Sequence, residues 1–267
     1  MTTCISSEDI MAFKNCLSPL IGAQINILNI PKDLLKSFEP SQIGTIVGTL
    51  MDVAIPELDK LYPDDGLFAK VGLSKHDGIL GDREGYPDYQ HNLGFRAELK
   101  LLYVDPEGVE MKVPATRREP SARLTQKVTV KNVIPEKDIL LVVAYQLREN
   151  AQHDGFYCPT IIDVGAFPVS ECIAARDYRL LNSGGRWFGN YETPAILSRI
   201  GKAKIEAGEE LDTTTYGRKE SEGKCFNEDT NFGKLKRIPY KPLQEYLKLH
   251  GATYSARGGY PSPWKIS

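Results

Sequence analysis

The apolar run DILLVVAYQL at positions 138–147 restricts the fold more than any other segment of this chain. A strand with one face in water alternates apolar and polar residues, whereas a continuous run of this length is typical of a strand buried on both faces. The run is also far shorter than a membrane span, which needs about 18 or more apolar residues. Hydrophobic residues make up 41% of the sequence, enough for a substantial core. The sequence therefore predicts a central sheet that other elements cover.

A second strand is expected at 95–104, FRAELKLLYV, where side chains alternate between two faces. Glu98 and Lys100 stand two residues apart and therefore leave the strand on the same face. Asp105-Pro-Glu-Gly108 is a strong turn signal. The segment VEMKV at 109–113 is expected to return beside the strand as the second arm of a hairpin.

Helical spacing of apolar residues predicts a helix that begins near Ser41, and a further helix is expected from Ser170 to about Asn182. The expected core face of the first helix carries Ile43, Ile46, Val47, Leu50, Ala54 and Leu58. Residues 121–133 fit either a helix or an alternating strand, and we favour the helix. The other expected elements are a strand at 160–164, helices at 193–208 and 242–250, and a long polar loop or insertion at 209–233. Together they predict an α/β fold, with α+β possible: a central mixed sheet flanked by helices, in a single domain over 1–267.

Charge and cysteine content limit the class of protein. The net charge is −2, so the bulk charge does not indicate a protein that coats nucleic acid, but basic residues gather at 112–131 and 234–241. The five cysteines are scattered and form no C-x-x-C pair, which fits a reducing cytoplasm. No secretory signal or membrane span is expected, and no Gly-Lys-Ser/Thr motif for a nucleotide cofactor is present.

The segment that carries chemistry is YPDYQHNLGFRAELK, which begins at Tyr86. If Asp88 ends a strand next to the Glu98 strand, the two carboxylates converge at the sheet edge with Lys100 beside them. Carboxylates are the ligands that Mg²⁺ prefers, and the backbone carbonyl of Leu99 is a third candidate donor. Such a cation polarises a phosphate and activates water, while a lysine orients that water or stabilises developing charge.

The pattern Pro87-Asp88, nine residues, Glu98-x-Lys100 resembles the PD-(D/E)XK nuclease superfamily, over residues 40–147. The resemblance implies a Mg²⁺-dependent nuclease in which Asp88, Glu98 and Lys100 are catalytic and Asp88, Glu98 and Leu99 bind the metal. It also implies a helix after the E-x-K strand, then a buried strand, and a further acid from the helix before the core strands. Glu57 is our first candidate for that acid and Glu39 the second.

Within this superfamily the size and the single expected activity favour a type II restriction endonuclease that cuts double-stranded DNA at a short specific sequence. Cutting both strands predicts a two-fold homodimer. Basic and amide side chains after the E-x-K strand are the candidate DNA contacts: Arg117, Arg118, Arg123, Gln126 and Lys127.

Three alternatives stay open. The first is a repair or phage recombination nuclease that recognises DNA structure. The second is a non-catalytic DNA-binding protein in which Glu98 and Lys100 form an ordinary ion pair. The third is a hydrolase that uses paired carboxylates on sugars, which the lysine and the scarcity of clustered aromatics make less attractive.

Overall fold

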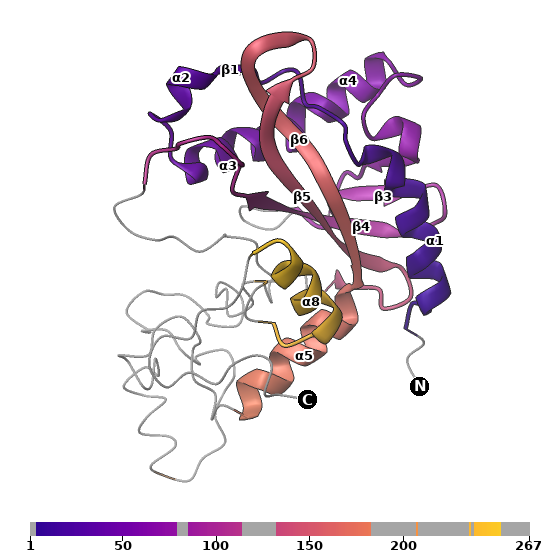
Figure 1. The fold of residues 1–267 in the computed structure, drawn as a ribbon. Coiled ribbons are helices and arrows are strands. Elements are labelled where there is room, and N and C mark those ends of the chain that lie inside the picture. Colours follow the sequence, from indigo (N-terminus) through magenta and orange to yellow (C-terminus); the bar gives the residue numbers. More distant parts are fainter. Residues whose placement is uncertain are drawn as a thin grey trace. The chain divides into compact units, whose positions relative to one another are not determined.

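A computed structural model describes residues 4–78, 85–113, 132–182, 207, 235 and 238–251. The chain forms two compact units. Unit 1 comprises 1–78, 87–121 and 135–168, and it contains the whole sheet; unit 2 comprises 79–86, 122–134 and 169–267. Figure 1 shows the elements in the colours of the sequence.

The sheet of unit 1 is mixed and has six strands in the order β1-β6-β5-β4-β3-β2. Only β4 and β5 pair in parallel; the other neighbours pair antiparallel. This arrangement, with helices packed against the sheet, confirms the predicted α/β class. The strands are β1 (Ile30–Pro31), β2 (Leu73–Lys75), β3 (Tyr89–His91), β4 (Arg96–Val104), β5 (Asp138–Asn150) and β6 (His153–Pro168).

The apolar run at 138–147 lies within β5, and all ten of its residues are buried. Its neighbours are β4 on one side and β6 on the other, so β5 is an interior strand. β6 is much longer than the strand expected at 160–164, because it continues as a hairpin arm along β5 almost to the end of both strands. A parallel pair such as β4–β5 requires a crossover connection, which residues 105–137 supply.

The helix predicted near Ser41 begins at Pro40 and continues through three pieces, α3 (Pro40–Thr49), η2 (Leu50–Ala54) and α4 (Ile55–Leu61). Glu39 and Gln42 form a reciprocal capping box at its start. The middle piece, η2, is a π turn, in which the Ile55 N–H donates to the Leu50 carbonyl five residues back. The proline at 56 explains this turn, because a proline has no N–H for the carbonyl four residues earlier and its ring clashes with that carbonyl.

The π turn changes which side chains of the helix are buried. Regular helical spacing predicted Ala54 and Leu58 on the core face, but Met51 and Ile55 are the buried residues, while Leu58 is 38% exposed. The extra residue in the turn rotates the second half of the helix relative to the first. The predicted apolar stripe was therefore right for the first half of the helix and wrong for the second half.

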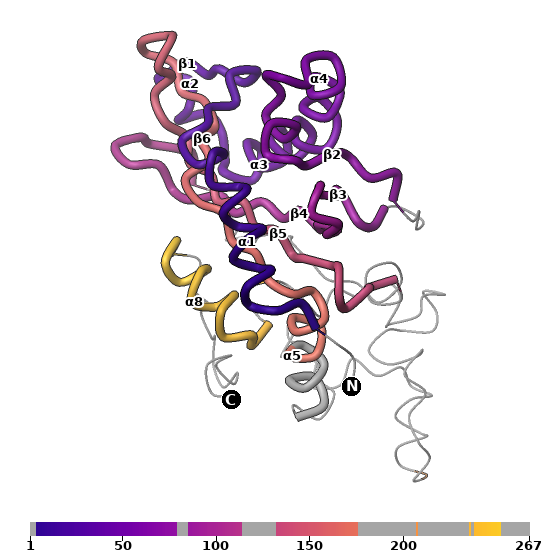
Figure 2. Tube along the Cα trace, turned by 90° about the vertical axis from the view of Figure 1, so that its right-hand side faces the viewer, coloured from indigo at the N-terminus to yellow at the C-terminus, as the bar shows by residue number. Residues whose placement is uncertain are grey.

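Two helices near the N-terminus were not predicted, α1 (Ser7–Leu17) and α2 (Lys32–Leu35). The sequence did contain the start signals of α1: the Ser6 side chain caps the helix, and Glu8 and Asp9 occupy its first turn. Phe13 of α1 is fully buried and makes edge-to-face contacts with His91 and Phe95. Figure 2 shows α1 running alongside the long strands of the sheet.

The segment 109–113 is not a strand, so the predicted hairpin partner is wrong. The turn before it does form, with Gly108 at a positive φ of 66°. The returning chain packs on the core instead of pairing with β4: the Lys112 N–H donates to the Phe38 carbonyl, and the Tyr103 hydroxyl contacts Met111 Sδ at 2.8 Å. The β5 strand already occupies one side of β4, and the other side is partly occupied by β3.

Unit 2 contains α5 (Val169–Asn182) and α8 (Lys241–Leu249), which confirm the helices expected at about 170–182 and 242–250. Buried Gln244 of α8 donates from Nε2 to the carbonyls of Leu235 and Ile238 and so ties the preceding segment to the helix. In the part of the chain that the structure describes, no helix is long and apolar enough to cross a membrane. The helix expected at 193–208 and the loop at 209–233 lie outside the described residues, apart from position 207.

Candidate active site

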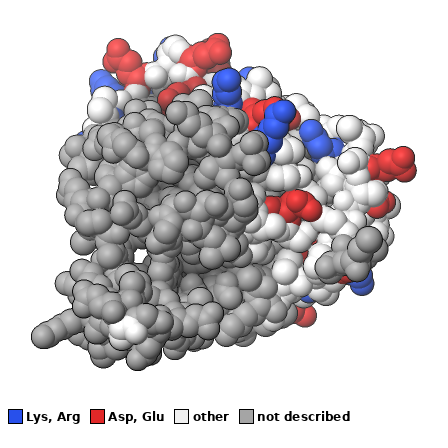
Figure 3. Space-filling model, turned by 90° about the horizontal axis from the view of Figure 1, so that it is seen from below, with Lys and Arg blue, Asp and Glu red and all other residues white. Residues whose placement is uncertain are grey.

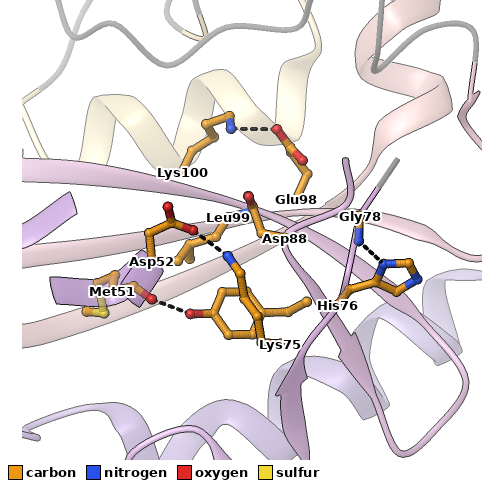
Figure 4. Close-up of polar contacts among 10 residues, drawn as sticks. Met51, Asp52, Lys75, His76, Gly78, Asp88, Glu98, Leu99 and Lys100 are labelled. Atoms are coloured by element: carbon orange, nitrogen blue, oxygen red, sulfur yellow. Dashed lines mark hydrogen bonds and ion pairs between the residues drawn. The ribbon is translucent and has the colours of Figure 1, made fainter. Parts of the chain in front are cut away.

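Glu98 and Lys100 lie on the same face of β4, as their spacing predicts, and they contact each other directly. Lys100 Nζ donates to Glu98 Oε1 at 2.6 Å (Figure 4). Both side chains are largely withdrawn from water, at 7% exposure for Glu98 and 19% for Lys100. An ion pair this sheltered loses little strength to solvent screening. The pair therefore presents a fixed charge arrangement at the sheet surface.

Asp88 precedes β3 and is attached to β4 on both sides of Glu98. Its backbone N–H donates to the Ala97 carbonyl at 3.1 Å, and its Oδ2 accepts the Leu99 N–H at 2.7 Å. The Asp88 carboxylate thus acts as a hydrogen-bond partner for the backbone of β4, just before β3 begins at Tyr89. The second oxygen, Oδ1, makes no hydrogen bond within the described part of the chain. These two bonds place Asp88 beside the part of β4 that carries Glu98, and the convergence of the two carboxylates on one cation stays a prediction.

The Leu99 carbonyl faces the same side of β4 as Asp88. In a strand, the N–H and C=O of one residue leave on the same side, and the Leu99 N–H is directed at Asp88. The paired part of β3 ends at Tyr89, opposite Ala97, so the carbonyl lies beyond the last residue pair of β3 and β4. Asp88 and the Leu99 carbonyl therefore lie on the same side of β4, at the end of its pairing with β3.

Asp52 is another acid of the helix before the core strands, and sequence reasoning did not select it. Asp52 lies in the π turn η2 and forms an ion pair with Lys75 of β2 (Figure 4). To select Asp52 from the sequence, one would need to know which side of the helix each residue after 50 faces. Regular helical spacing does not give this. The available signal was Pro56 inside an otherwise helical pattern, because an interior proline distorts the preceding turn.

The two acids proposed from the sequence for this role lie in other surroundings. Glu57 is 63% exposed and pairs with Lys60 one turn along the same helix. The side chain of Glu39 caps α3 and lies 3.8 Å from Lys112. Each has a local structural partner that accounts for its position.

Tyr89 connects Asp52, Lys75 and Asp88. Its hydroxyl donates to the Met51 carbonyl, and its ring lies 5.1 Å from Lys75 Nζ. Burial, followed by the negative charges of Asp88, Asp52 and Asp59, raises the pKa of Tyr89 well above its usual range. The phenol is therefore neutral, and three carboxylates lie near enough to it to act on its ionisation.

Lys75 and Glu98 lie on opposite faces of the sheet. Lys75 pairs with Tyr89, and Tyr89 pairs with Ala97, so Lys75 shares the face of Ala97 rather than that of Glu98. The next residue, His76, donates its N–H to the Asp88 carbonyl at 3.1 Å, and its Nδ1 accepts the Gly78 N–H. Asp88 is thus held between β2 and β4, with an ion pair on each face of the sheet.

The donor set at this edge suits a hard divalent cation. Mg²⁺ binds through one or two carboxylates and keeps several waters, so Asp88, Glu98 and the Leu99 carbonyl fit it. Among the described residues, no group of three His, Cys, Asp or Glu side chains meets the geometry for a metal site. Any cation held here would therefore take its remaining ligands from backbone, water and substrate.

The predicted DNA contacts Arg117, Arg118, Arg123, Gln126 and Lys127 lie outside the described residues. Figure 3 shows one face of the molecule, and on its described part basic and acidic side chains are interspersed. That part of the surface carries no single-sign patch. The DNA-binding role of the segment 112–131 therefore stays a prediction.

Comparisons with protein-family models, with curated protein sequences and with solved structures found no match.

Proposed function

We propose that this chain is a Mg²⁺-dependent endonuclease that hydrolyses phosphodiester bonds of double-stranded DNA, acting as a type II restriction enzyme. The observation that carries the proposal is the attachment of Asp88 to Leu99 beside the Glu98–Lys100 pair. These neighbouring residues offer two carboxylates, a strand carbonyl and a lysine, which are groups that metal-assisted hydrolysis of a phosphodiester can use.

Each of these residues has a distinct role in the proposed reaction. Asp88, Glu98 and the Leu99 carbonyl would hold the cation, which when bound supplies charge at the scissile phosphate and lowers the pKa of water. Lys100 orients the attacking water and stabilises negative charge on the phosphate as the bond to the leaving oxygen breaks. Glu98 holds the Lys100 ammonium group in position through the 2.6 Å contact.

The order of elements supports the resemblance to PD-(D/E)XK nucleases. A helix precedes the core strands, and the E-x-K strand β4 is followed, after a crossover, by the buried strand β5 in parallel pairing. Asp52 supplies an acid from the preceding helix. The segment 109–113 adds no extra strand between β4 and β5, so the strand order is closer to the expected core than the sequence suggested.

A cleavage assay tests the proposal. Purified protein is incubated at low salt with supercoiled plasmid and with genomic DNA, with Mg²⁺ or with EDTA. We expect discrete fragments of the plasmid with Mg²⁺ only, and a loss of about 100-fold or more in rate for Glu98→Gln and for Lys100→Met. The matched control is Glu245→Gln, which removes the acid of an exposed Glu–Lys pair on α8 and leaves the rate unchanged.

The products separate the alternatives. Smeared or branch-dependent products would assign the chain to DNA repair or phage recombination. Retained DNA binding without any Mg²⁺-dependent cleavage would overturn the nuclease and leave a DNA-binding protein.

A further inference from the structure

The ion pair between Lys75 and Asp52 has no part in the proposed reaction as described above. Lys75 lies on the edge strand β2, and its ammonium group contacts the Asp52 carboxylate in the π turn η2 (Figure 4). Because the Tyr89 hydroxyl bonds to the Met51 carbonyl, the turn that carries Asp52 is held beside Lys75. The position of this pair is therefore set by the fold and not by chance contact of two long side chains.

The two members of the pair differ in how freely they can move. The Lys75 side chain is 27% exposed and lies against the Tyr89 ring, whereas the Asp52 side chain is 64% exposed. Exposed ion pairs are weak because water competes with both charges. The free-energy cost of breaking the Asp52–Lys75 ion pair is therefore small, so Asp52 can exchange Lys75 for a divalent cation.

The charge balance at this edge sets the direction of the effect. Lys75 precedes His76, whose N–H donates to the Asp88 carbonyl at 3.1 Å, and Lys75 is the register partner of Tyr89, the residue after Asp88. A cation bound through Asp88 would therefore lie close to Lys75. Like charges repel, and the ammonium group lowers the affinity of the edge for a second cation. The same ammonium group is the ion-pair partner of Asp52.

We propose that Lys75 is an exchangeable counter-ion of Asp52, which occupies this carboxylate in the metal-free protein and competes with the divalent cation for it. Cation binding transfers Asp52 from Lys75 toward the metal edge and leaves the lysine free for a phosphate of the substrate. Lys75 is thus a positioning residue rather than a catalytic one. The inference rests on the metal site of the proposed function.

Calcium binding measured by titration calorimetry, without DNA and at low salt, tests the inference independently of cleavage. We expect Lys75→Met to tighten Ca²⁺ binding about 3- to 10-fold, since a nearby positive charge is removed and Asp52 is released. Lys60→Met is the matched control, because it removes a lysine paired with an acid of the same helix but away from the edge. It should change the affinity less than about twofold.

A double-mutant cycle assigns the effect to Asp52. In the Asp52→Asn background, Lys75→Met should retain at most a small part of its effect on Ca²⁺ affinity. Unchanged or weaker binding by Lys75→Met, or equal tightening by Lys60→Met, would overturn the counter-ion role.

Two further results separate this inference from the proposed function. Ca²⁺ binding that Glu98→Gln abolishes and Lys75→Met strengthens supports the inference even if no DNA is cut. Absence of Ca²⁺ binding by the unaltered protein overturns both the metal site and the counter-ion.

Discussion

At the scale of single residues, the structure gives Glu57 and Asp52 different surroundings and adds Asp52 to the candidates for the helix acid. Glu57 is exposed beside Lys60, whereas Asp52 forms an ion pair with Lys75 of the edge strand β2. The two acids are on one helix only five residues apart. Asp52 lies within the π turn η2, whereas Glu57 lies after that turn in α4.

Neutral replacements of the same shape test whether Asp52 or Glu57 contributes to cleavage. We expect Asp52→Asn to lower the rate of plasmid cleavage about 10-fold or more, because a carboxylate that supports a metal site contributes on this order. Glu57→Gln should change the rate less than about twofold. Initial rates at saturating Mg²⁺ provide the measurement, and equal loss in both variants would contradict the assignment.

His91 predicts a pH dependence of stability. Its Nδ1 accepts the Leu93 N–H at 3.1 Å and its Nε2 contacts the Val71 carbonyl at 2.9 Å, so the neutral ring with hydrogen on Nε2 satisfies both contacts. Burial lowers the pKa of His91 below its ordinary 6.5, and the bond to Val71 opposes this in part. A proton on Nδ1 would remove the contact with Leu93.

The sign follows from which state binds the proton. Below about pH 6.5 the unfolded chain takes up a proton at His91 and the folded protein does so only at lower pH, so the free energy of unfolding falls as pH falls. The slope from this group is at most about 1.4 kcal/mol per pH unit. Urea unfolding between pH 7.5 and 5 should show a smaller decrease for His91→Gln, while the exposed His153→Gln keeps the original slope.

At the scale of elements, the parallel pairing of β4 and β5 is fixed at its start by an ion pair. Arg96 Nε and Nη2 donate to the two carboxylate oxygens of Asp138, each at 2.6 Å, and these two residues are register partners. Asp138 is 1% exposed and Arg96 14%. The pair fixes the register that places Glu98 beside Leu140.

Removal of one partner from a buried pair leaves an uncompensated charge. We therefore expect Asp138→Asn to lower the free energy of unfolding by about 3–5 kcal/mol. The exposed pair of Glu57 and Lys60 is the comparison, and Lys60→Met should cost about 1 kcal/mol or less. Both are measured by urea denaturation, and equal costs would contradict a structural role for the buried pair.

At the scale of the whole molecule, the proposed cutting of both DNA strands calls for two active sites, since the described chain presents a single Asp88–Glu98–Lys100 set. We expect sedimentation equilibrium to give twice the chain mass of 29.8 kDa. A dimer that cuts in concert converts supercoiled plasmid directly to linear DNA. A monomer with persistent nicked intermediates would contradict the two-fold arrangement.

The sequence by itself determined those features that depend on local periodicity. Alternation along 95–104 placed Glu98 and Lys100 on one face, and the apolar run at 138–147 indicated a strand buried on both sides, because side-chain direction in a strand follows from position alone. The helices at about 170–182 and 242–250 could likewise be predicted from the sequence. The unpredicted α1 shows that a capped helix can be overlooked when its apolar stripe is short.

Only the tertiary structure decided which distant residues meet at the edge of the sheet. The bond from Leu99 to Asp88, the pairing of Lys75 with Asp52 and the rejection of 109–113 as a strand all depend on strand register and on which sides of β4 are already occupied. The phase of the helix after Leu50 depends on a π turn, which Pro56 signals but apolar spacing does not reveal. These contacts join residues far apart in the chain, so their partners are settled by packing and not by the pattern of any one segment.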